Sequence, residues 1–198
     1  YFETDHLSVG IMDNEGNIDF KNRGEIPKVE ANTLLAEKFP FTESRDGRDI
    51  YGNELFAEPA RDAVLKAAAG VRISADDRYA YAEVTGHPKL DWTGNIHVLD
   101  VYTTKGDVGY KTGHLIYDGS IDVKGCLKSG FRIQGHDVQI KEVDGGEIRA
   151  TGNITVMEGV NGAVIFARGH VSARYIHDAH IHCLGNLVVG KEIVDSNI

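Results

Sequence analysis

Five related stretches in the second half of the chain decide its fold: GSIDV at 119–123, GHDVQI at 135–140, GNITV at 152–156, GHVSA at 169–173 and GNLVV at 185–189. Their leading glycines are Gly119, Gly135, Gly152, Gly169 and Gly185, which follow one another at steps of 16, 17, 17 and 16 residues. Apolar residues keep the same step. The equivalent positions hold Ile121, Val138, Ile154, Val171 and Leu187, then Val123, Ile140, Val156, Ala173 and Val189, and then Leu127, Val143, Val160, Ile176 and Ile193. Such a repeat predicts a solenoid.

Within each repeat the apolar residues stand two apart, as Ile154 and Val156 do, which places both side chains on one face of a strand. A further run is expected to align Phe131, Ile148, Val164, Ile181 and Ile198, and two residues later Ile133, Ala150, Phe166 and Cys183. Small residues between the runs predict bends at Ser129, Gly146, Gly162, Ala179 and Ser196. The sequence therefore predicts a mainly β protein that contains a parallel β-helix of about five short coils of 16–17 residues.

The first half of the chain lacks this period. We expect residues 1–92 to form a small β-rich domain and residues 93–198 to form the β-helix, truncated at its C-terminal end because Ile198 falls within a coil. A hairpin turn is predicted at Asp13–Gly16, and a buried segment at Asn32–Phe39. The segment Pro59–Ala69 is ambiguous, since a proline at its start and Gly70 after its end favour a helix.

Net charge, apolar runs and cysteine content limit the classes of protein to which the chain can belong. The net charge of −9 argues against general binding of nucleic acid, and no run approaches the eighteen apolar residues of a membrane span. The two cysteines lie three coils apart, so we expect no disulfide between them and a reducing compartment. Cys183 is expected to be a small core residue.

Two groups of residues are candidates for binding a protein partner. The first is a glycine-punctuated loop of mixed charge that contains Arg45, Asp46, Arg48, Asp49 and Tyr51, and Arg and Tyr side chains anchor interfaces well. A turn held by local ion pairs would use the same residues. The second is an outward ladder of Lys124, Lys141, Met157 and Arg174, which suits an acidic partner but equally suits a solvated surface. A similar outward ladder is expected at Arg132, Arg149, Ile165 and His182.

The nine histidines do not form a convincing metal site. His136, Asn153, His170 and Asn186 are expected at one turn position, with the two histidines two coils and roughly 10 Å apart, too far to share an ion. His180 and His182 project outward together but lack a third ligand. No catalytic set, phosphate-binding loop or cofactor motif stands out, so we expect no metal, no cofactor and no enzyme activity.

The chain resembles the flagellar assembly protein A family over nearly its whole length. The residues that carry the resemblance include Asn17-Ile-Asp-Phe20, Ile26-Pro-Lys-Val29, Leu35-Ala36, Pro40, Gly47-Arg-Asp-Ile-Tyr-Gly52, Ala69-Gly70-Val71, Tyr81-Ala82, Gly86, Pro88, Gly106-Asp-Val108 and Gly169-His-Val-Ser-Ala-Arg-Tyr-Ile176. The resemblance implies a small β-rich domain before a right-handed β-helix, and favours a strand over a helix at Pro59–Ala69. It also implies a bacterial, cytoplasmic, non-enzymatic scaffold that binds proteins in flagellar assembly, close to the flagellated pole.

Two other functions are weighed against that one. The solenoid is similar to the bactofilins and to a domain of a bacterial cell-division inhibitor, so a polymerising scaffold, or a smaller homo-oligomer, is the alternative. A carbohydrate-active β-helix enzyme is less favoured, because coils of 16–17 residues leave little room for a substrate groove.

Overall fold

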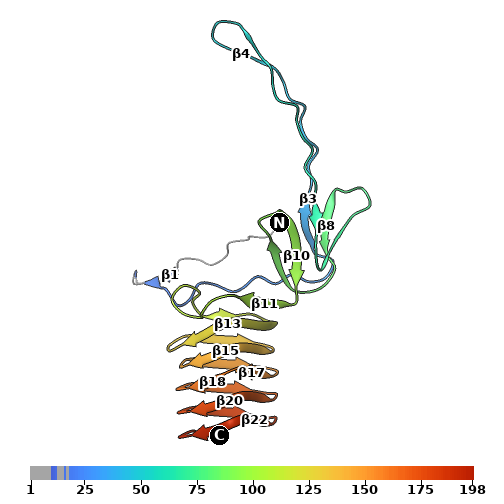
Figure 1. The fold of residues 1–198 in the computed structure, drawn as a ribbon. Coiled ribbons are helices and arrows are strands. Elements are labelled where there is room, and N and C mark those ends of the chain that lie inside the picture. The colour runs from blue at the N-terminus through green and yellow to red at the C-terminus, as the bar shows by residue number, and fades with distance from the viewer. Residues whose placement is uncertain (1–9, 13–15, 17) are drawn as a thin grey trace.

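The computed structural model of the protein describes residues 10–12, 16 and 18–198. Figure 1 shows a straight stack of coils with a smaller group of sheets and a long thin arm at its N-terminal end. The described residues form strands and turns and contain no helix. The predicted β class and the predicted solenoid after a small β-rich region are confirmed.

Two parallel sheets make up the solenoid, which has about six turns. The first sheet contains β11 (Val101–Thr104), β13 (Ser120–Lys128), β15 (Val138–Asp144), β17 (Ile154–Val156), β18 (Gly159–Asn161), β20 (Val171–His177) and β22 (Leu187–Val194). The second contains β12 (Leu115–Ile116), β14 (Arg132–Gly135), β16 (Glu147–Ala150), β19 (Val164–Ala167) and β21 (His180–Cys183). Each strand pairs with its equivalent in the next coil, so a single core runs along the stack.

In the first sheet the predicted alignment is confirmed. Ile121 pairs with Val138, Val138 with Ile154, and Ile154 with Val171. These side chains are buried, because alternate residues of each strand face the inside of the coil. Fully burying such a side chain stabilises the fold by about 1.5–3 kcal/mol relative to exposing it.

In the second sheet the predicted alignment is wrong. The aligned and fully buried residues are Ile133, Ile148, Ile165 and Ile181. Phe166 therefore points outward, and Cys183 aligns with Ala167 and Ala150 instead of with Phe166. The expected ladder through Arg132, Arg149, Ile165 and His182 does not exist. Arg149 instead shares its outward position with Gln134, Phe166 and His182.

The error has two physical causes. One coil turns through Ser129–Phe131, whereas the next needs only Gly145 and Gly146, so the step from Ile133 to Ile148 is 15 residues. The run Val164–Ala167 is also apolar at every position, so its period does not reveal which side faces the core.

The bends between the two sheets depend on left-handed backbone conformations. Positive φ angles recur at Gly130, Gly145, Gly162, Asp178 and Asp195, with values of 80°, 88°, 61°, 47° and 47°. Of the bend residues expected from the sequence, Gly162 belongs to this set, and Gly146 also has a positive φ, of 81°. Glycine accepts this conformation without strain, and Asp tolerates it better than most residues. The turn backbone thus fixes where each coil changes direction.

Two small sheets precede the solenoid. One contains β3 (Leu34–Glu37), β7 (Val71–Ile73) and β8 (Tyr79–Ala82), and the other contains β6 (Lys66–Ala67), β9 (His87–Leu90) and β10 (Asn95–Leu99). They share a core of Leu35, Val71, Ala80, Ala82, Ile96 and Val98. The segment Pro59–Ala69 is not helical, and the favoured strand forms only at Lys66–Ala67. The domain boundary at residues 92 and 93 stays a prediction.

A hairpin near the N-terminus is present, in which β1 (Ile11–Met12) pairs with β2 (Ile18–Asp19). The predicted turn at Asp13–Gly16 lies largely outside the described residues. The chain then crosses the first coil, where the His114 N–H donates to the carbonyl oxygen of Lys21 at 2.7 Å. Ile26 is buried in the solenoid core. This crossing segment therefore covers the N-terminal end of the rod, as the caps of repeat proteins do.

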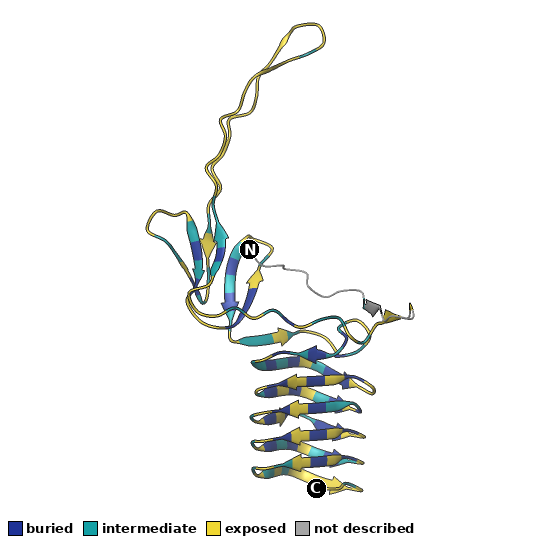
Figure 2. Cartoon of the chain, turned by 180° about the vertical axis from the view of Figure 1, so that it is seen from behind, coloured by how far each residue is buried: buried dark blue, intermediate teal, exposed yellow. Residues whose placement is uncertain are grey.

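The arm extends from β3 and returns to β6. Its only described strand pair is β4 (Gly47–Arg48) with β5 (Glu54–Leu55). Figure 2 shows the arm exposed along nearly all of its length, whereas buried and exposed residues alternate along the coils. The arm therefore projects into solvent away from the rod (Figure 1).

Candidate partner-binding surfaces

The arm ends in a tight turn held by one carboxylate. Asp49 Oδ1 accepts hydrogen bonds from the backbone N–H groups of Tyr51 at 2.8 Å and Asn53 at 2.9 Å. Asp49 Oδ2 accepts a third from the Asn53 side-chain amide at 2.8 Å. These bonds, with that of the Asn53 side chain the largest influence, lower the pKa of Asp49. Gly52 completes the turn at a φ of 85°. The Asp49 carboxylate therefore stabilises the turn at the tip, and its oxygens are already used in hydrogen bonds within the turn.

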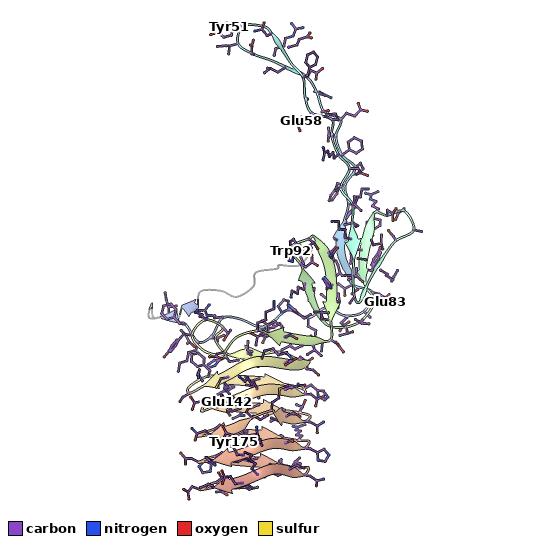
Figure 3. All side chains as sticks on the ribbon, in the orientation of Figure 1. Tyr51, Glu58, Glu83, Trp92, Glu142 and Tyr175 are labelled. Carbon is purple, nitrogen blue, oxygen red and sulfur yellow. The ribbon has the colours of Figure 1, made fainter. Side chains whose placement is uncertain are left out.

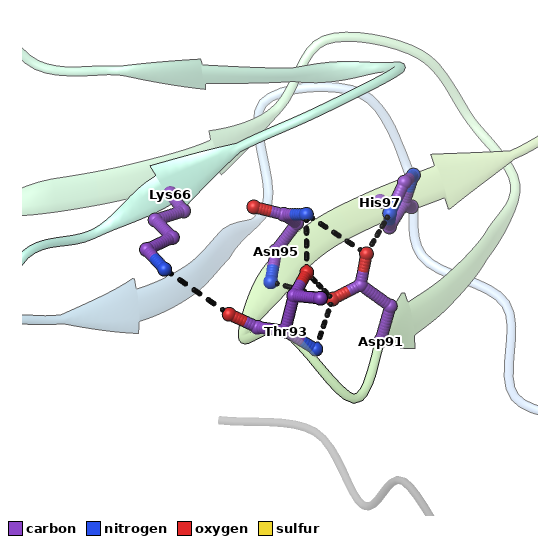
Figure 4. Close-up of polar contacts among 5 residues, drawn as sticks. All are labelled: Lys66, Asp91, Thr93, Asn95 and His97. Carbon is purple, nitrogen blue, oxygen red and sulfur yellow. Dashed lines mark hydrogen bonds and ion pairs between the residues drawn. The ribbon is translucent and has the colours of Figure 1, made fainter.

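The same turn occurs in a second hairpin, between β9 and β10 (Figure 4). Asp91 accepts from the N–H groups of Thr93 and Asn95 and from the Asn95 amide, each at 2.9 Å. It also accepts from the Thr93 hydroxyl at 2.6 Å and lies 3.1 Å from His97 Nε2. The Thr93 hydroxyl is the main cause that holds the pKa of Asp91 far below its usual range. The spacing Asp-x-x-Gly-Asn thus encodes a rigid hairpin end twice.

The arm tip presents apolar side chains to solvent. Ile50 is 91% exposed and Tyr51 is 83% exposed, and Leu55 and Phe56 behind them are exposed as well. Figure 3 places Tyr51 at the far end of the arm. Aromatic and aliphatic side chains held on a rigid turn lose little conformational freedom on binding, so they are effective anchors for a partner.

Of the five loop residues predicted from the sequence, only some are free to bind. Asp46 accepts the N–H of Ala57 at 2.8 Å, and Arg48 lies 3.3 Å from Glu54 in an exposed ion pair. Arg45 makes no ion pair with a residue that the structure describes. The tip is therefore held by local bonds, as one alternative expected, while Arg45 and Tyr51 remain available.

The apolar character continues down the arm. Phe39, Phe41 and Val64 are exposed where the two halves of the arm leave the sheets. The salt bridge of 2.6 Å between Lys38 and Asp62 joins those halves at the base. So many exposed large apolar side chains on one projection are typical of a surface that meets another molecule.

The predicted ladder on the first sheet does form. Lys124, Lys141, Met157 and Arg174 are exposed at equivalent positions of successive coils. Lys124 pairs with Asp122 at 2.6 Å, and Lys141 lies 3.7 Å from Glu158. Arg174 has no ion pair among the described residues. Acidic neighbours thus offset much of the ladder's positive charge.

The expected turn position for histidines has a definite structural role. The aligned residues are Asp137, Asn153, His170 and Asn186, so Asp137 stands where His136 was expected. The side chains of Asp137, Asn153 and His170 each accept the backbone N–H of the equivalent residue one coil further on, at 2.6, 2.8 and 2.9 Å. These side chains satisfy turn N–H groups that the sheets leave unpaired.

No group of three His, Cys, Asp or Glu side chains gathers as a metal site in the described part of the chain. His182 lies beside Phe166, with 6.4 Å between the ring centroids. Cys126 and Cys183 are both free thiols. None of the described residues belongs to a helix that is long and apolar enough to cross a membrane.

Comparison with known families decides what kind of protein this is. The β-solenoid domain model of flagellar assembly protein A matches residues 100–198, and the model of that protein's N-terminal region matches residues 2–93. The chain belongs to the flagellar assembly protein A family. Neither the curated proteins nor the solved structures contain a significant match to it.

Several exposed apolar residues of the arm were not predicted from the sequence. Sequence reasoning identified Tyr51 but not Ile50, Leu55 or Phe56, because apolar residues in a short segment usually indicate burial. A usable signal was the repeated spacing Asp49-x-x-Gly52-Asn53 and Asp91-x-x-Gly94-Asn95, which marks two hairpin ends.

Proposed function

We propose that this protein is a non-enzymatic scaffold of flagellar assembly that acts in the bacterial cytoplasm and captures a protein partner through the tip of its arm. Membership of the flagellar assembly protein A family supports the process. The observation that carries the binding role is the arm tip, where Ile50 and Tyr51 are almost fully exposed on a turn that Asp49 holds rigid.

The arrangement suits a scaffold. The solenoid core is continuous along the coils, and the crossing segment around Ile26 joins the N-terminal part to it. Close packing makes such a core stiff. The arm reaches away from that body, so a partner at its tip would be held at a distance from the rod (Figure 3).

The charged residues at the tip define the test of this site. The double change Arg45→Glu and Arg48→Glu places like charges next to Glu43 and Glu54, and should weaken capture of the main partner from a lysate of a flagellated bacterium at least tenfold. That factor corresponds to about 1.4 kcal/mol. Capture would be measured by quantitative mass spectrometry of the bound proteins.

The matched control reverses two charges on the rod, Lys141→Glu and Arg174→Glu. Both proteins should show the circular dichroism of the wild type, since all four residues are exposed. If the rod variant loses the partner and the arm variant keeps it, the binding site lies on the rod and this assignment is wrong. If both keep it, neither charged surface takes part.

A further inference from the structure

We infer that the second sheet of the solenoid carries a separate binding groove for an extended acidic peptide that bears an aromatic or aliphatic side chain. The groove has a volume of about 500 Å³ and lies on the outer surface of β14, β16, β19 and β21. Arg149, Phe166 and His182 form one wall, and Thr151, Arg168 and Leu184 form the other.

The walls arise directly from strand geometry. Side chains at alternate positions of a strand point outward, so the two walls are two residues, or roughly 7 Å, apart. Between them lie Gly135, Ala150 and Ala167, which point inward and are buried. The floor is therefore backbone with no outward side chain, which leaves a channel along the rod axis.

The groove exposes an aromatic face that is held in place. Phe166 is 40% exposed, the Arg149 guanidinium lies 5.2 Å from its ring centroid, and the His182 ring lies 6.4 Å away on the next coil. Leu184 on the opposite wall is 71% exposed. A cation and a ring that flank Phe166 restrict its motion, so it is prepared to stack against an apolar side chain.

The charge of the groove is positive in an acidic protein. Arg168 has no ion pair among the residues that the structure describes, and Arg149 shares its charge with Glu147. Among the described residues that line the groove, the one carboxylate is that of Asp118, which lies 2.9 Å from Lys28 Nζ in a salt bridge. The chain as a whole carries a net charge of −9. Charge complementarity therefore favours an anionic occupant.

The dimensions favour an extended chain over a compact small molecule. Equivalent residues of successive coils are about 4.8 Å apart, so the wall from Gln134 to His182 spans roughly 14 Å, the length of about four extended residues. Of the strands beneath, β14, β16 and β19 are already paired on both sides, so over these strands the occupant is held by its side chains. Small-molecule pockets usually enclose most of their ligand, whereas Phe166 and Leu184 leave this groove open.

Fluorescence anisotropy with two labelled six-residue peptides tests this inference on the full chain. In the acidic peptide four acidic residues flank a phenylalanine and a leucine. In the basic peptide four lysines replace the four acidic residues. The acidic peptide should bind at least tenfold more tightly than the basic one. Arg168→Glu should reduce its affinity at least tenfold, Arg168→Lys should restore most of it, and Phe166→Ser should weaken it.

The matched control is Lys105→Glu, which reverses one charge at an exposed residue outside the groove and should leave the affinity unchanged. Equal loss in Lys105→Glu and Arg168→Glu would mean that net charge alone acts, and equal binding of both peptides would exclude the groove as an acidic-peptide site. Inorganic phosphate that displaces the peptide at millimolar concentration would identify a phosphate site instead. A dimer that Phe56→Ser abolishes would assign the groove to the arm of a second copy. Because the groove and the arm tip share no residue, either can fail without the other.

Discussion

At the scale of single residues, the polar ladder of Asp137, Asn153, His170 and Asn186 shows how the coils stay in step. The N–H groups of Asn153, His170 and Asn186 each donate to the side chain of the equivalent residue one coil earlier. Residues of three chemical types fill one position because each provides a hydrogen-bond acceptor there. This position therefore requires a side chain that accepts a hydrogen bond, but it does not require one particular residue type.

The ladder predicts the effect of replacing one of its members. Asn153→Leu removes the acceptor for the His170 N–H and should lower the free energy of unfolding by about 1 kcal/mol. Asn153→Asp keeps an acceptor, as Asp137 already does one coil earlier, and should remain close to the wild type. Urea unfolding followed by circular dichroism measures both. Equal stability of the two variants would show that the hydrogen bond contributes nothing.

At the scale of elements, one carboxylate accepts several hydrogen bonds in each of the two Asp-x-x-Gly-Asn hairpins, and one of these hairpins predicts a pH effect. The pKa of Asp91 is lowered in the folded protein. Its contribution to stability is therefore complete above the unfolded-state pKa of about 3.9 and is lost as the pH falls below that value toward the folded-state pKa.

The variant Asp91→Asn cannot titrate, so its stability should decline less than that of the wild type between pH 7 and pH 3. At pH 7 it should be less stable, because an amide replaces the carboxylate that accepts from Thr93, Asn95 and His97. Scanning calorimetry at both pH values measures this, with Asp100→Asn, at an exposed carboxylate, as the control. Identical pH dependence of wild type and Asp91→Asn would contradict this account of the hairpin.

The elements also show how far the sequence could predict the structure. The first sheet was predicted residue by residue, since Ile121, Val138 and Ile154 keep a step that local alternation supports. The second sheet was not, because the shorter bend at Gly145 and Gly146 changes the step and the apolar run Val164–Ala167 conceals it. The groove beside Phe166 was missed for the same reason.

The arm could be predicted only in part. The sequence identified the mixed charges and Tyr51, but the distance of the tip from the rod depends on how residues 38–65 leave the sheets. No local pattern encodes that path. The candidate ladder at Lys124, Lys141 and Arg174 was predicted correctly as a surface, whereas its ion pairs with Asp122 and Glu158 depend on side-chain conformations that spacing does not reveal.

At the scale of the whole molecule, the stiff rod and the exposed arm each carry one candidate binding site. Charges and apolar side chains gather at two separate places, the arm tip and the groove of the second sheet, so one molecule could hold two partners at a fixed separation. Linking two binding events in this way raises their combined affinity without new contacts. Because the tip lies on the projection farthest from the core, its residues can be changed without disturbing the fold (Figure 2).

The most direct test of the central claim is to count flagella per cell by electron microscopy. The double change Ile50→Ser and Tyr51→Ser would be introduced into the bacterium that carries this gene. The matched control is Trp92→Ser, because Trp92 is 96% exposed in the second hairpin that has the same turn. With protein levels equal to the wild type, we expect most cells of the Ile50 and Tyr51 variant to lose their flagella and cells of the Trp92 variant to keep them. Normal flagella in cells that carry the double change would contradict the claim that the arm tip captures a flagellar assembly partner.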